Sequence, residues 1–432
     1  MPRPHRLERL SIVTGPSGIA RTAASFPRDA SAMRSETGDG AGSAAIRTGA
    51  PAFAGVPAAG SAGAAEGKEH TDAPARPVHS IYGALDLGTN NCRLLVAKPS
   101  RRGFVVIDAF SRIIRLGEGV LSSGELSDKA MKRTIDALRV CADKMRRRGV
   151  TRSRLIATEA CRIAINGPEF IDRVHNETGL ALEIVGRETE AKLAVSGCAS
   201  LLDRSCDWAL VFDIGGGSSE LIWLDLNQLG RSRRRSLNDR VGVQNCIAAW
   251  TSLPIGVVSL AERHGGRDVS PEDYEAMVDD VMVAIQSFES QHKFSERVAQ
   301  RQTHFLGTSG TVTTISGIHL KLPQYERSRV DGCWLTADDV RRVSNDLIAM
   351  SYAERVAQPC IGHERADLVL AGCAILEALL RVWPCQRLRV ADRGLREGIL
   401  TTLMAEDGHD RRAQGRSHRR RGGGGKPDPG RS

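Results

Sequence analysis

The chain has 432 residues and a formal net charge of +9, and 4% of its residues are aromatic. At roughly 150 residues per domain, this length predicts more than one domain. No stretch of about 18 apolar residues occurs, so no membrane-spanning helix is expected. The few aromatic residues argue against a stacking surface for nucleic acid, so no specific nucleic-acid partner is expected.

The two ends of the chain differ in composition from its middle. Residues 1–79 are rich in Ala, Gly, Ser, Pro and Arg and show no periodic apolar pattern, so we expect them to be disordered. Residues 404–432 crowd arginines around Gly422–Gly425 and are expected to be disordered as well. Residues 411–432 of this tail contribute most of the net charge. It is either a solvated extension or a segment that attracts polyanions transiently.

Ten cysteines are dispersed through apolar surroundings, and none of them forms a C-x-x-C pair. This pattern is typical of a reduced protein that uses cysteine as a small hydrophobic residue, which predicts a cytoplasmic location. The N-terminal residues include arginines but no continuous hydrophobic segment, which argues against secretion. An organelle transit peptide and a start codon upstream of the true one are the alternative explanations of residues 1–79.

The folded part opens with a β-meander, because three apolar runs of strand length follow one another with short turns between them. Apolar residues three or four apart then predict an amphipathic helix that begins at Ser127 and ends before Gly149. Strands and helices then alternate through the rest of this half. The strands are expected at Ile81–Leu87, Cys92–Ala97, Phe104–Phe110, Leu155–Thr158 and Leu182–Val185, and the later helices at 168–177 and from Arg187.

The meander then repeats in the second half. The runs Trp208–Phe212 and Leu221–Leu224 flank a glycine turn as the first two strands do, so the chain contains two copies of one unit. Two copies predict two domains, 80–190 and 191–403, with a cleft between them, in an α/β fold whose helices cover the sheets. The other elements predicted here are a surface hairpin at Gly230–Arg240, helices at 271–298, 310–320, 336–350, 366–382 and 394–404, and strands at Thr303–Leu306 and Leu388–Ala391.

Three loops share the order of a strand end, small residues and hydroxyls. Glycine lets the backbone approach an anion closely, Ser and Thr donate further hydrogen bonds, and a helix after the third loop adds its positive end. Each loop alone is equally explained by a tight turn, whereas the three together with two strand-end aspartates indicate a phosphate site. The residues predicted to bind phosphate are Asp86, Gly88, Thr89, Asn90, Gly215, Gly216, Gly217, Ser218, Ser219, Gly307, Thr308, Ser309, Gly310 and Thr311.

Cleavage of a phosphoanhydride by water also needs carboxylates, to hold Mg²⁺ and to position or deprotonate the water. Asp213 and Glu220 flank the second loop and are the candidate metal ligands. Glu188 and Glu190 open a helix near the boundary between the halves, where the alternative is a helix start stabilised by the helix dipole. Arg162 follows a strand end and is either a bidentate phosphate clamp or a surface cation.

Six motifs stand in one order along residues 80–403. They are Ala84–Leu94, Ala157–Arg162, Asp213–Glu220, Ser252–Gly256, Gly307–Thr311 and Asp392–Gly398. In this order they closely resemble the exopolyphosphatase/guanosine pentaphosphate phosphatase family. The resemblance implies the actin-like ATPase architecture, in which two ribonuclease-H-like α/β domains flank a central cleft.

The resemblance also implies roles for single residues. Glu190 falls on the family's catalytic glutamate and Arg162 on its phosphate-clamping arginine, while Asp213 and Glu220 fall on its Mg²⁺ ligands. The chain departs from the family in the first loop, where Thr89 and Asn91 stand in place of common serines. Its fold is expected to end near residue 404, where many members continue into an all-helical region.

The sequence therefore predicts a Mg²⁺-dependent exopolyphosphatase that removes the terminal phosphate of inorganic polyphosphate. The first alternative is the conversion of guanosine pentaphosphate to the tetraphosphate, a reaction of the bacterial stringent response. A kinase on the same fold would need an adenine pocket and an acceptor site that no motif indicates. A non-catalytic sensor is the fourth reading, against which the retained carboxylates argue. A homodimer is a further expectation.

Overall fold

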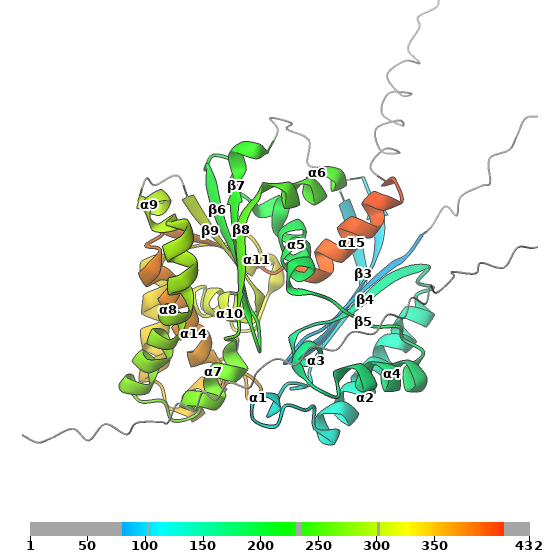
Figure 1. Ribbon diagram of the computed structural model, residues 1–432, viewed down its shortest axis with the longest axis horizontal. Coiled ribbons are helices and arrows are strands. Elements are labelled where there is room, and N and C mark those ends of the chain that lie inside the picture. The colour runs from blue at the N-terminus through cyan, green and yellow to red at the C-terminus, as the bar shows by residue number, and fades with distance from the viewer. Residues whose placement is uncertain (1–79, 102, 230–235, 300–302, 410–432) are drawn as a thin grey trace, which may run out of the picture. The chain divides into compact units, whose positions relative to one another are not determined.

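In the computed structural model of the chain, residues 80–101, 103–229, 236–299 and 303–409 are described. The segments 1–79 and 410–432, which the composition predicts to be disordered, lie outside these residues. Two β-sheets with covering helices organise the described part (Figure 1). The predicted α/β class is confirmed, and we call the parts built on the two sheets lobe I and lobe II.

Lobe I is built on a five-stranded sheet in the order β3-β2-β1-β4-β5. The first three strands pair antiparallel as the predicted meander, and β4 and β5 continue the sheet in parallel. The register places Asp86, near the end of β1, directly opposite Arg93 of β2. The strands are β1 (Tyr82–Leu87), β2 (Asn91–Ser100), β3 (Gly103–Ile113), β4 (Arg152–Ala157) and β5 (Glu183–Ile184).

Lobe II is built on a six-stranded sheet in the order β10-β11-β9-β6-β7-β8. Its strands β8, β7, β6 and β9 repeat the arrangement of β3, β2, β1 and β4, because two antiparallel pairs are again followed by a parallel pair. The predicted duplication is thus confirmed. Asp213 lies opposite Glu220 in this register. The strands are β6 (Trp208–Ile214), β7 (Ser219–Asp225), β8 (Ile247–Leu253), β9 (Thr303–Thr308), β10 (Trp334–Thr336) and β11 (Arg387–Ala391).

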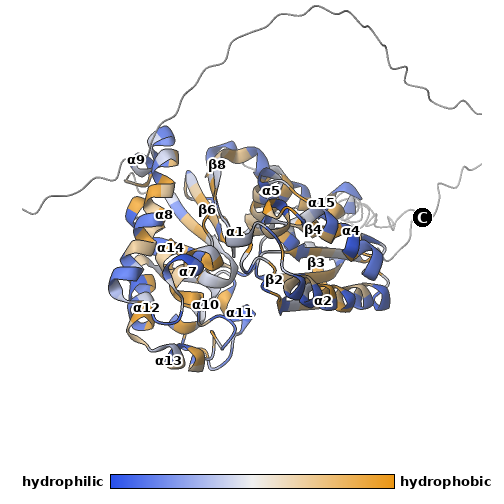
Figure 2. Ribbon diagram, turned by 60° about the horizontal axis from the view of Figure 1, so that its bottom comes forward, coloured by the Kyte–Doolittle hydropathy of each residue, from blue (hydrophilic) through white to orange (hydrophobic). Residues whose placement is uncertain are grey.

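The covering helices of lobe I are amphipathic. In α2, Ile135, Leu138 and Cys141 are buried and Asp136 and Arg139 are exposed, and Figure 2 shows both hydrophobic and hydrophilic residues along this helix. Ser127 caps α2 by accepting a hydrogen bond from the backbone nitrogen of Ala130, as the sequence predicts. The helices of this lobe are α1 (Val120–Ser123), α2 (Asp128–Arg147), α3 (Glu159–Ile163) and α4 (Gly167–Thr178).

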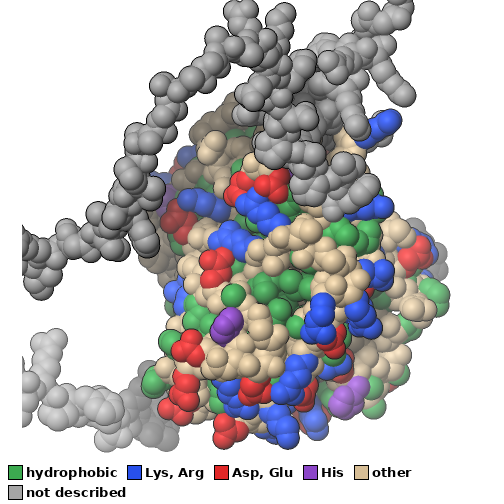
Figure 3. Space-filling model, turned by 90° about the vertical axis from the view of Figure 1, so that its right-hand side faces the viewer, with side chains coloured by type: hydrophobic (Ala, Val, Ile, Leu, Met, Phe, Trp, Pro, Cys, Tyr) green, Lys and Arg blue, Asp and Glu red, His purple; other side chains and the backbone are tan. Residues whose placement is uncertain are grey.

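The outer face of lobe I carries charges of both signs. Figure 3 shows Lys and Arg side chains interspersed with Asp and Glu side chains on the side of the molecule where this lobe lies. Arg139 of α2 pairs with Asp136 (2.8 Å) and with Glu177 of α4 (2.6 Å), and Lys144 pairs with Asp108 of β3 (2.7 Å). Exposed pairs such as Arg139–Asp136 contribute little to stability.

Two predictions for lobe II are wrong. The hairpin predicted at Gly230–Arg240 is not formed in its described part, because Ser236 and Asp239 make a capping box that opens a short helix, α6. The single helix predicted at 271–298 is two helices, since Lys293 adopts a left-handed conformation (φ 51°) where α8 ends.

The remaining helices lie around the second sheet, except α6, which packs on α15 and α5. Within the described part of the chain, none is long and apolar enough to cross a membrane. They are α6 (Leu237–Gly242), α7 (Val257–His264), α8 (Pro271–His292), α9 (Phe294–Ala299), α10 (Ser309–His319), α11 (Arg327–Val330), α12 (Ala337–Ala349), α13 (Tyr352–Ala357) and α14 (Val369–Val382), with 3₁₀ turns at Ala199–Leu201, Leu226–Gln228 and Val243–Cys246.

Two helices cross between the lobes, α5 (Arg187–Cys198) and α15 (Leu395–Glu406). Helix α15 packs on β1 and β2 of lobe I, while α5 contacts β7 of lobe II (Figure 1). A Cβ atom at Gly197 would lie 1.9 Å from the carbonyl oxygen of Gly394, and one at Gly398 would lie 1.9 Å from that of Leu193. The crossing therefore requires glycine at both positions.

Gly398→Ala is expected to destabilise the protein by roughly 1–3 kcal/mol or more, because the added methyl group forces the two helices apart. Urea unfolding of the variant and the wild type measures the difference. Gly242→Ala is the control, since a Cβ atom at Gly242 in α6 meets nothing within 4 Å. The control should be neutral or slightly stabilising. Equal stability of the two variants would contradict the close crossing.

Candidate active site

The first two loops are equivalent turns between strands. The backbone nitrogen of Gly88 donates to the carbonyl of Asn91 (2.9 Å), and that of Gly215 donates to the carbonyl of Ser218 (2.9 Å). The two turns approach each other closely, since a Cβ atom at Gly216 would lie 3.3 Å from the backbone nitrogen of Asn90. The loops of the two lobes therefore meet at the cleft.

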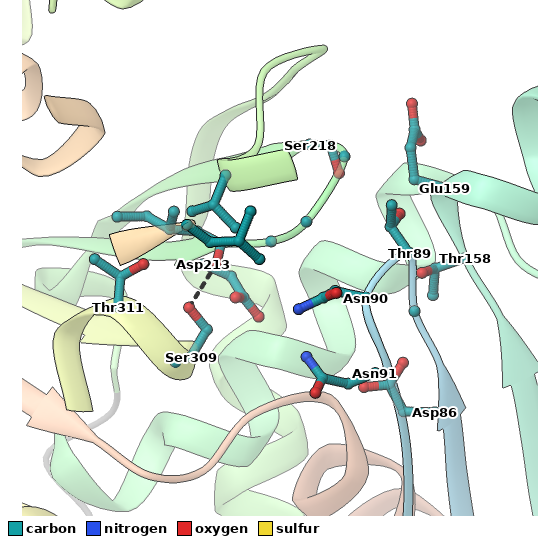
Figure 4. Close-up of a pocket in the computed structure, with 18 of the residues that line it drawn as sticks. Asp86, Thr89, Asn90, Asn91, Thr158, Glu159, Asp213, Ser218, Ser309 and Thr311 are labelled. Atoms are coloured by element: carbon teal, nitrogen blue, oxygen red, sulfur yellow. Dashed lines mark hydrogen bonds between the residues drawn. The ribbon is translucent and has the colours of Figure 1, made fainter. Parts of the chain in front are cut away.

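One cavity lies where the three predicted loops come together. The first loop faces Asp213 and Ser309 of lobe II (Figure 4). Ser309 has a left-handed backbone (φ 80°), and its Oγ donates to the carbonyl of Ile214 (2.8 Å), which ties the start of α10 to the end of β6. The predicted site residues that line this cavity are Asp86, Gly88, Thr89, Asn90, Glu190, Asp213, Gly215, Gly216, Gly217, Ser218, Glu220, Ser309, Gly310 and Thr311.

Three residues predicted to bind phosphate make internal contacts instead of lining this cavity. Ser219 is buried in β7, and its Oγ donates to the carbonyl of Ile255 (2.7 Å). Gly307 belongs to strand β9 and packs closely on Phe212, because a Cβ atom there would lie 2.6 Å from the phenyl ring. Thr308 also ends this strand and donates its hydroxyl to a backbone carbonyl.

The two residues predicted to be catalytic lie next to each other. Glu190, in the first turn of α5, accepts hydrogen bonds from Nη1 and Nη2 of Arg162 (3.3 Å each). Arg162 also donates to Glu159 (Nε, 3.0 Å) and to the carbonyl of Val185 (2.6 Å). Arg162 is outside the lining of the cavity, and its contacts fix the carboxylate of Glu190, which is 15% exposed.

Burial and mutual repulsion change the acidity of the carboxylates. Asp213 and Glu220 are cross-strand neighbours, so their side chains stand on one face of the sheet. Burial, and then the charge of Asp86, raise the pKa of Asp213 to about 6. Burial and the charge of Asp213 raise the pKa of Glu220 to about 7, although two serine hydroxyls donate to its carboxylate. Burial and the charge of Glu220 also raise the pKa of Glu190.

Lobe I has a cation where lobe II has a carboxylate. Arg93 occupies in the first meander the position that Glu220 occupies in the second. Across the strands, Asp86 thus faces a positive charge and Asp213 a negative one. Since the charge of Arg93 lowers the pKa of both aspartates, a bound cation would relieve repulsion chiefly at Glu220. Among the residues that the structure describes, no group of three or more His, Cys, Asp or Glu side chains is arranged to hold a metal ion.

A second cavity adjoins the first, and Asp86 and Asp213 line both. It has a volume of about 870 Å³, against about 140 Å³ for the first. Six arginines line it, and four of them make no side-chain hydrogen bond or ion pair within the described residues. These four are Arg93, Arg112, Arg365 and Arg396.

Some residues of the two cavities receive no role from the sequence. Glu159 is 4% exposed and lines the first cavity, where it also pairs with Arg187 (2.6 Å). Its position in the motif Ala157–Arg162 is the feature of the sequence that could have indicated it as a site residue. Arg365 has no such signal, because it lies between α13 and α14, outside every motif, and only the fold brings it to the cleft.

Comparison with known proteins identifies the family of this chain. Residues 95–407 match the model of the Ppx/GppA phosphatase family. The chain belongs to the Ppx/GppA phosphatase family. A guanosine-5'-triphosphate,3'-diphosphate pyrophosphatase of Photobacterium profundum is 27% identical over 339 residues. The match covers 77% of this chain and 61% of that relative, so this Ppx/GppA chain spans less than two thirds of the relative's length.

Solved structures of Ppx/GppA relatives match the fold. An exopolyphosphatase-like protein is 27% identical with a TM-score of 0.66, over 75% of this chain and 98% of that protein. The Ppx/GppA family member of Aquifex aeolicus is 25% identical with a TM-score of 0.59, over 76% of this chain and 99% of that protein. The chain thus has the two-domain, actin-like fold that the resemblance implies.

The raised pKa values of Asp213 and Glu220 predict how stability depends on pH. A carboxyl group with a raised pKa in the folded state favours folding while it is protonated, and this stability is lost as the pH rises toward about 6 to 7. In EDTA at about pH 8, Asp213→Asn is therefore expected to melt above the wild type, by roughly 2–4 °C. The difference in melting temperature between the two proteins should be smaller at about pH 5.

Thermal unfolding at the two pH values measures this effect. Glu188→Gln is the control, because Glu188 is 60% exposed and pairs with Lys192 (2.6 Å) on the same helix. This variant should follow the wild type at both pH values. A wild type that melts above Asp213→Asn at about pH 8 in EDTA would contradict the raised pKa of Asp213.

Proposed function

We propose that this chain is a Mg²⁺-dependent exopolyphosphatase, which hydrolyses the terminal phosphoanhydride bond of inorganic polyphosphate and releases orthophosphate. The observation that carries the proposal is the junction of two cavities at Asp86 and Asp213. The smaller cavity combines glycine loops with carboxylates, the larger one is lined by six arginines, and Arg93 and Arg365 line both. A polyanion whose end is cleaved by water needs both kinds of site.

The terminal phosphate suits the smaller cavity. Backbone N–H groups of the glycine loops and the N-terminal end of α10 offer donors to phosphate oxygens. Thr89, Ser218 and Thr311 line the same space and add hydroxyls. At about 140 Å³ the cavity is smaller than the roughly 300–1,000 Å³ of most ligand pockets, which favours a single end group.

Asp213 and Glu220 are the residues that would hold Mg²⁺. In sites that handle phosphate, Mg²⁺ is usually bound by one or two carboxylates together with substrate oxygens and water. This pair offers two carboxylates on one face of the sheet, and their repulsion favours a cation between them. When bound, Mg²⁺ would supply charge neutralisation at the phosphate oxygens.

Glu190 would act as the general base. Burial and the charge of Glu220 raise its pKa, and a carboxylate with a raised pKa is a stronger base. Arg162 orients its carboxylate through two hydrogen bonds. In the proposed reaction the oxygen of a water molecule bonds to the terminal phosphorus and a water proton passes to Glu190. The bond to the bridging oxygen breaks, and the shortened chain leaves.

The rest of the substrate would lie in the larger cavity. Its volume of about 870 Å³ is that of a ligand pocket. Arg93, Arg365 and Arg396 line it and make no side-chain hydrogen bond or ion pair among the described residues, although the charges of Arg93 and Arg396 act on Asp86. Guanidinium groups bind phosphate in bidentate fashion. Guanosine pentaphosphate also presents several phosphates, and the relative from Photobacterium profundum is named for a nucleotide of this kind. Conversion of guanosine pentaphosphate to the tetraphosphate is the second candidate function.

The two candidates are separated by measuring the orthophosphate released with Mg²⁺ from polyphosphate, from guanosine pentaphosphate and from ATP with added acceptors. We expect the fastest release from polyphosphate. Orthophosphate release from guanosine pentaphosphate but not from polyphosphate would favour the second candidate. Transfer of a phosphoryl group from ATP to an added acceptor would indicate a kinase. Binding of a substrate without release of orthophosphate would indicate a sensor. The cytoplasmic location and the homodimer stay predictions from the sequence.

Glu190→Gln is expected to lower kcat for polyphosphate by about 10²–10⁴, because the variant keeps the shape of the side chain and loses the base. Orthophosphate release under saturating substrate measures the change, and thermal unfolding verifies that the variant is folded. Glu188→Gln, two residues away on the exposed side of α5, is the matched control and should keep wild-type kcat. A folded Glu190→Gln variant with wild-type kcat would exclude Glu190 as the base.

A further inference from the structure

An ion pair connects the two lobes across the cleft. Arg115, which follows β3 in lobe I, meets Asp367, which precedes α14 in lobe II, through Nη1 to Oδ2 (2.9 Å) and Nη2 to Oδ1 (3.1 Å). Nη2 also donates to the carbonyl of Glu364 (3.2 Å). The side chains are 32% and 20% exposed, so the pair is partly shielded from solvent. Two parallel N–H···O bonds make this contact specific in direction as well as strong.

Arg115 is part of a short segment, 114–119, that is bonded to the first loop. The backbone nitrogens of Ile114 and Arg115 both donate to the carbonyl of Asn90 (2.8 and 3.1 Å), and that of Gly117 donates to the carbonyl of Thr89 (2.9 Å). Arg133 of α2 donates to the carbonyl of Arg115 (2.9 Å) and holds the segment from the other side. A displacement of Arg115 therefore moves the backbone of the first phosphate loop.

Asp367 has the corresponding connection to the third loop. The next residues along the chain, Leu368 and Val369, line the first cavity. Helix α14 begins there and packs tightly on the third loop, because a Cβ atom at Gly372 would lie 2.5 Å from Oγ1 of Thr311. The Arg115–Asp367 pair thus sets the separation between the first loop and the third.

Segment 114–119 also reaches the second loop. The backbone nitrogen of Gly119 donates to Oε1 of Glu262 in α7 (3.0 Å). The start of α7 is itself bonded to the second loop, since Val257 and Val258 donate to the carbonyls of Gly215 and Gly216 (2.9 and 2.8 Å). Figure 1 shows α1 and α7 at one end of the contact between the lobes and α5 and α15 at the other.

We infer that Arg115 and Asp367 form a latch that closes the cleft at the end away from the α5–α15 crossing, and that Arg115 is a positioning residue for the reaction. The latch holds the loops of lobe I and lobe II at the spacing at which one phosphate contacts both. Without it the lobes separate at this end, and substrate binding has to close them. The part of the role that concerns catalysis rests on the proposed function.

The latch itself is tested without substrate, by hydrogen exchange of the full-length protein followed by mass spectrometry. Arg115→Ala and Asp367→Ala are each expected to speed exchange about tenfold in peptides that cover 114–119 and 257–264. Arg139→Ala is the matched control, because Arg139 makes two ion pairs of similar length within lobe I. It should leave both peptides unchanged. Wild-type exchange in the Arg115→Ala and Asp367→Ala variants would overturn the latch.

The positioning role is tested by the kinetics of phosphate release from polyphosphate. Arg115→Ala is expected to lower kcat/KM about tenfold, chiefly through KM, because binding now includes closure. Arg115→Lys keeps the positive charge but loses the two parallel N–H donors of the guanidinium group. Its kcat/KM should therefore lie between those of the wild type and Arg115→Ala. The double variant Arg115→Ala/Asp367→Ala should lose no more than either single variant, since one interaction is removed in all three.

Faster exchange in Arg115→Ala together with wild-type kcat/KM would overturn the positioning role. Additive losses in the double variant would also overturn it, since the two residues would then act independently. A wild type that releases no phosphate from any substrate would refute the proposed function, and the exchange measurement would still decide whether the latch exists.

Discussion

Five carboxylates line one cavity, and the mutual repulsion of four of them, Asp86, Glu190, Asp213 and Glu220, is the constraint on which the rest of the site depends. Strand pairing fixes three of them and the first turn of α5 fixes Glu190, so none can move away to relieve the repulsion. Burial raises the pKa of each one. The carboxylates therefore lower the stability of the folded protein when no cation is bound, as functional sites commonly do, and a bound cation would raise it again.

The duplicated meander is used differently in its two halves. The turns are equivalent, and both present glycine backbone to the cleft. The residue opposite the strand-end aspartate differs, since it is Arg93 in lobe I and Glu220 in lobe II. Under the proposed function, Arg93 would serve the anionic substrate and Glu220 a cation. The α5–α15 crossing joins the halves at one end and the Arg115–Asp367 pair joins them at the other, so the spacing between the loops is fixed from both sides.

Patterns within one segment could be predicted from the sequence, and contacts between distant segments could not. Apolar runs and capping residues such as Ser127 located most strands and helices, and the repeated Asp-x-Gly turn indicated two lobes. The break at Lys293 was missed because the apolar periodicity continues through it, whereas the backbone turns. Gly307 stands in a glycine- and hydroxyl-rich stretch that is typical of a loop, but it belongs to strand β9 and packs on Phe212. Arg365 and Asp367 reach the cleft only through tertiary structure, so no local pattern marks them.

The most direct test of the central claim is a crystal structure of the Glu190→Gln variant grown with polyphosphate and Mn²⁺, in which anomalous scattering locates the metal. We predict one Mn²⁺ bound by Asp213 and Glu220, and a terminal phosphate in contact with the loops at Gly88, Gly215 and Gly310. The rest of the chain should run past the arginines of the larger cavity. A metal bound away from both carboxylates, or a polyphosphate end outside the cavity where the three loops meet, would contradict the account.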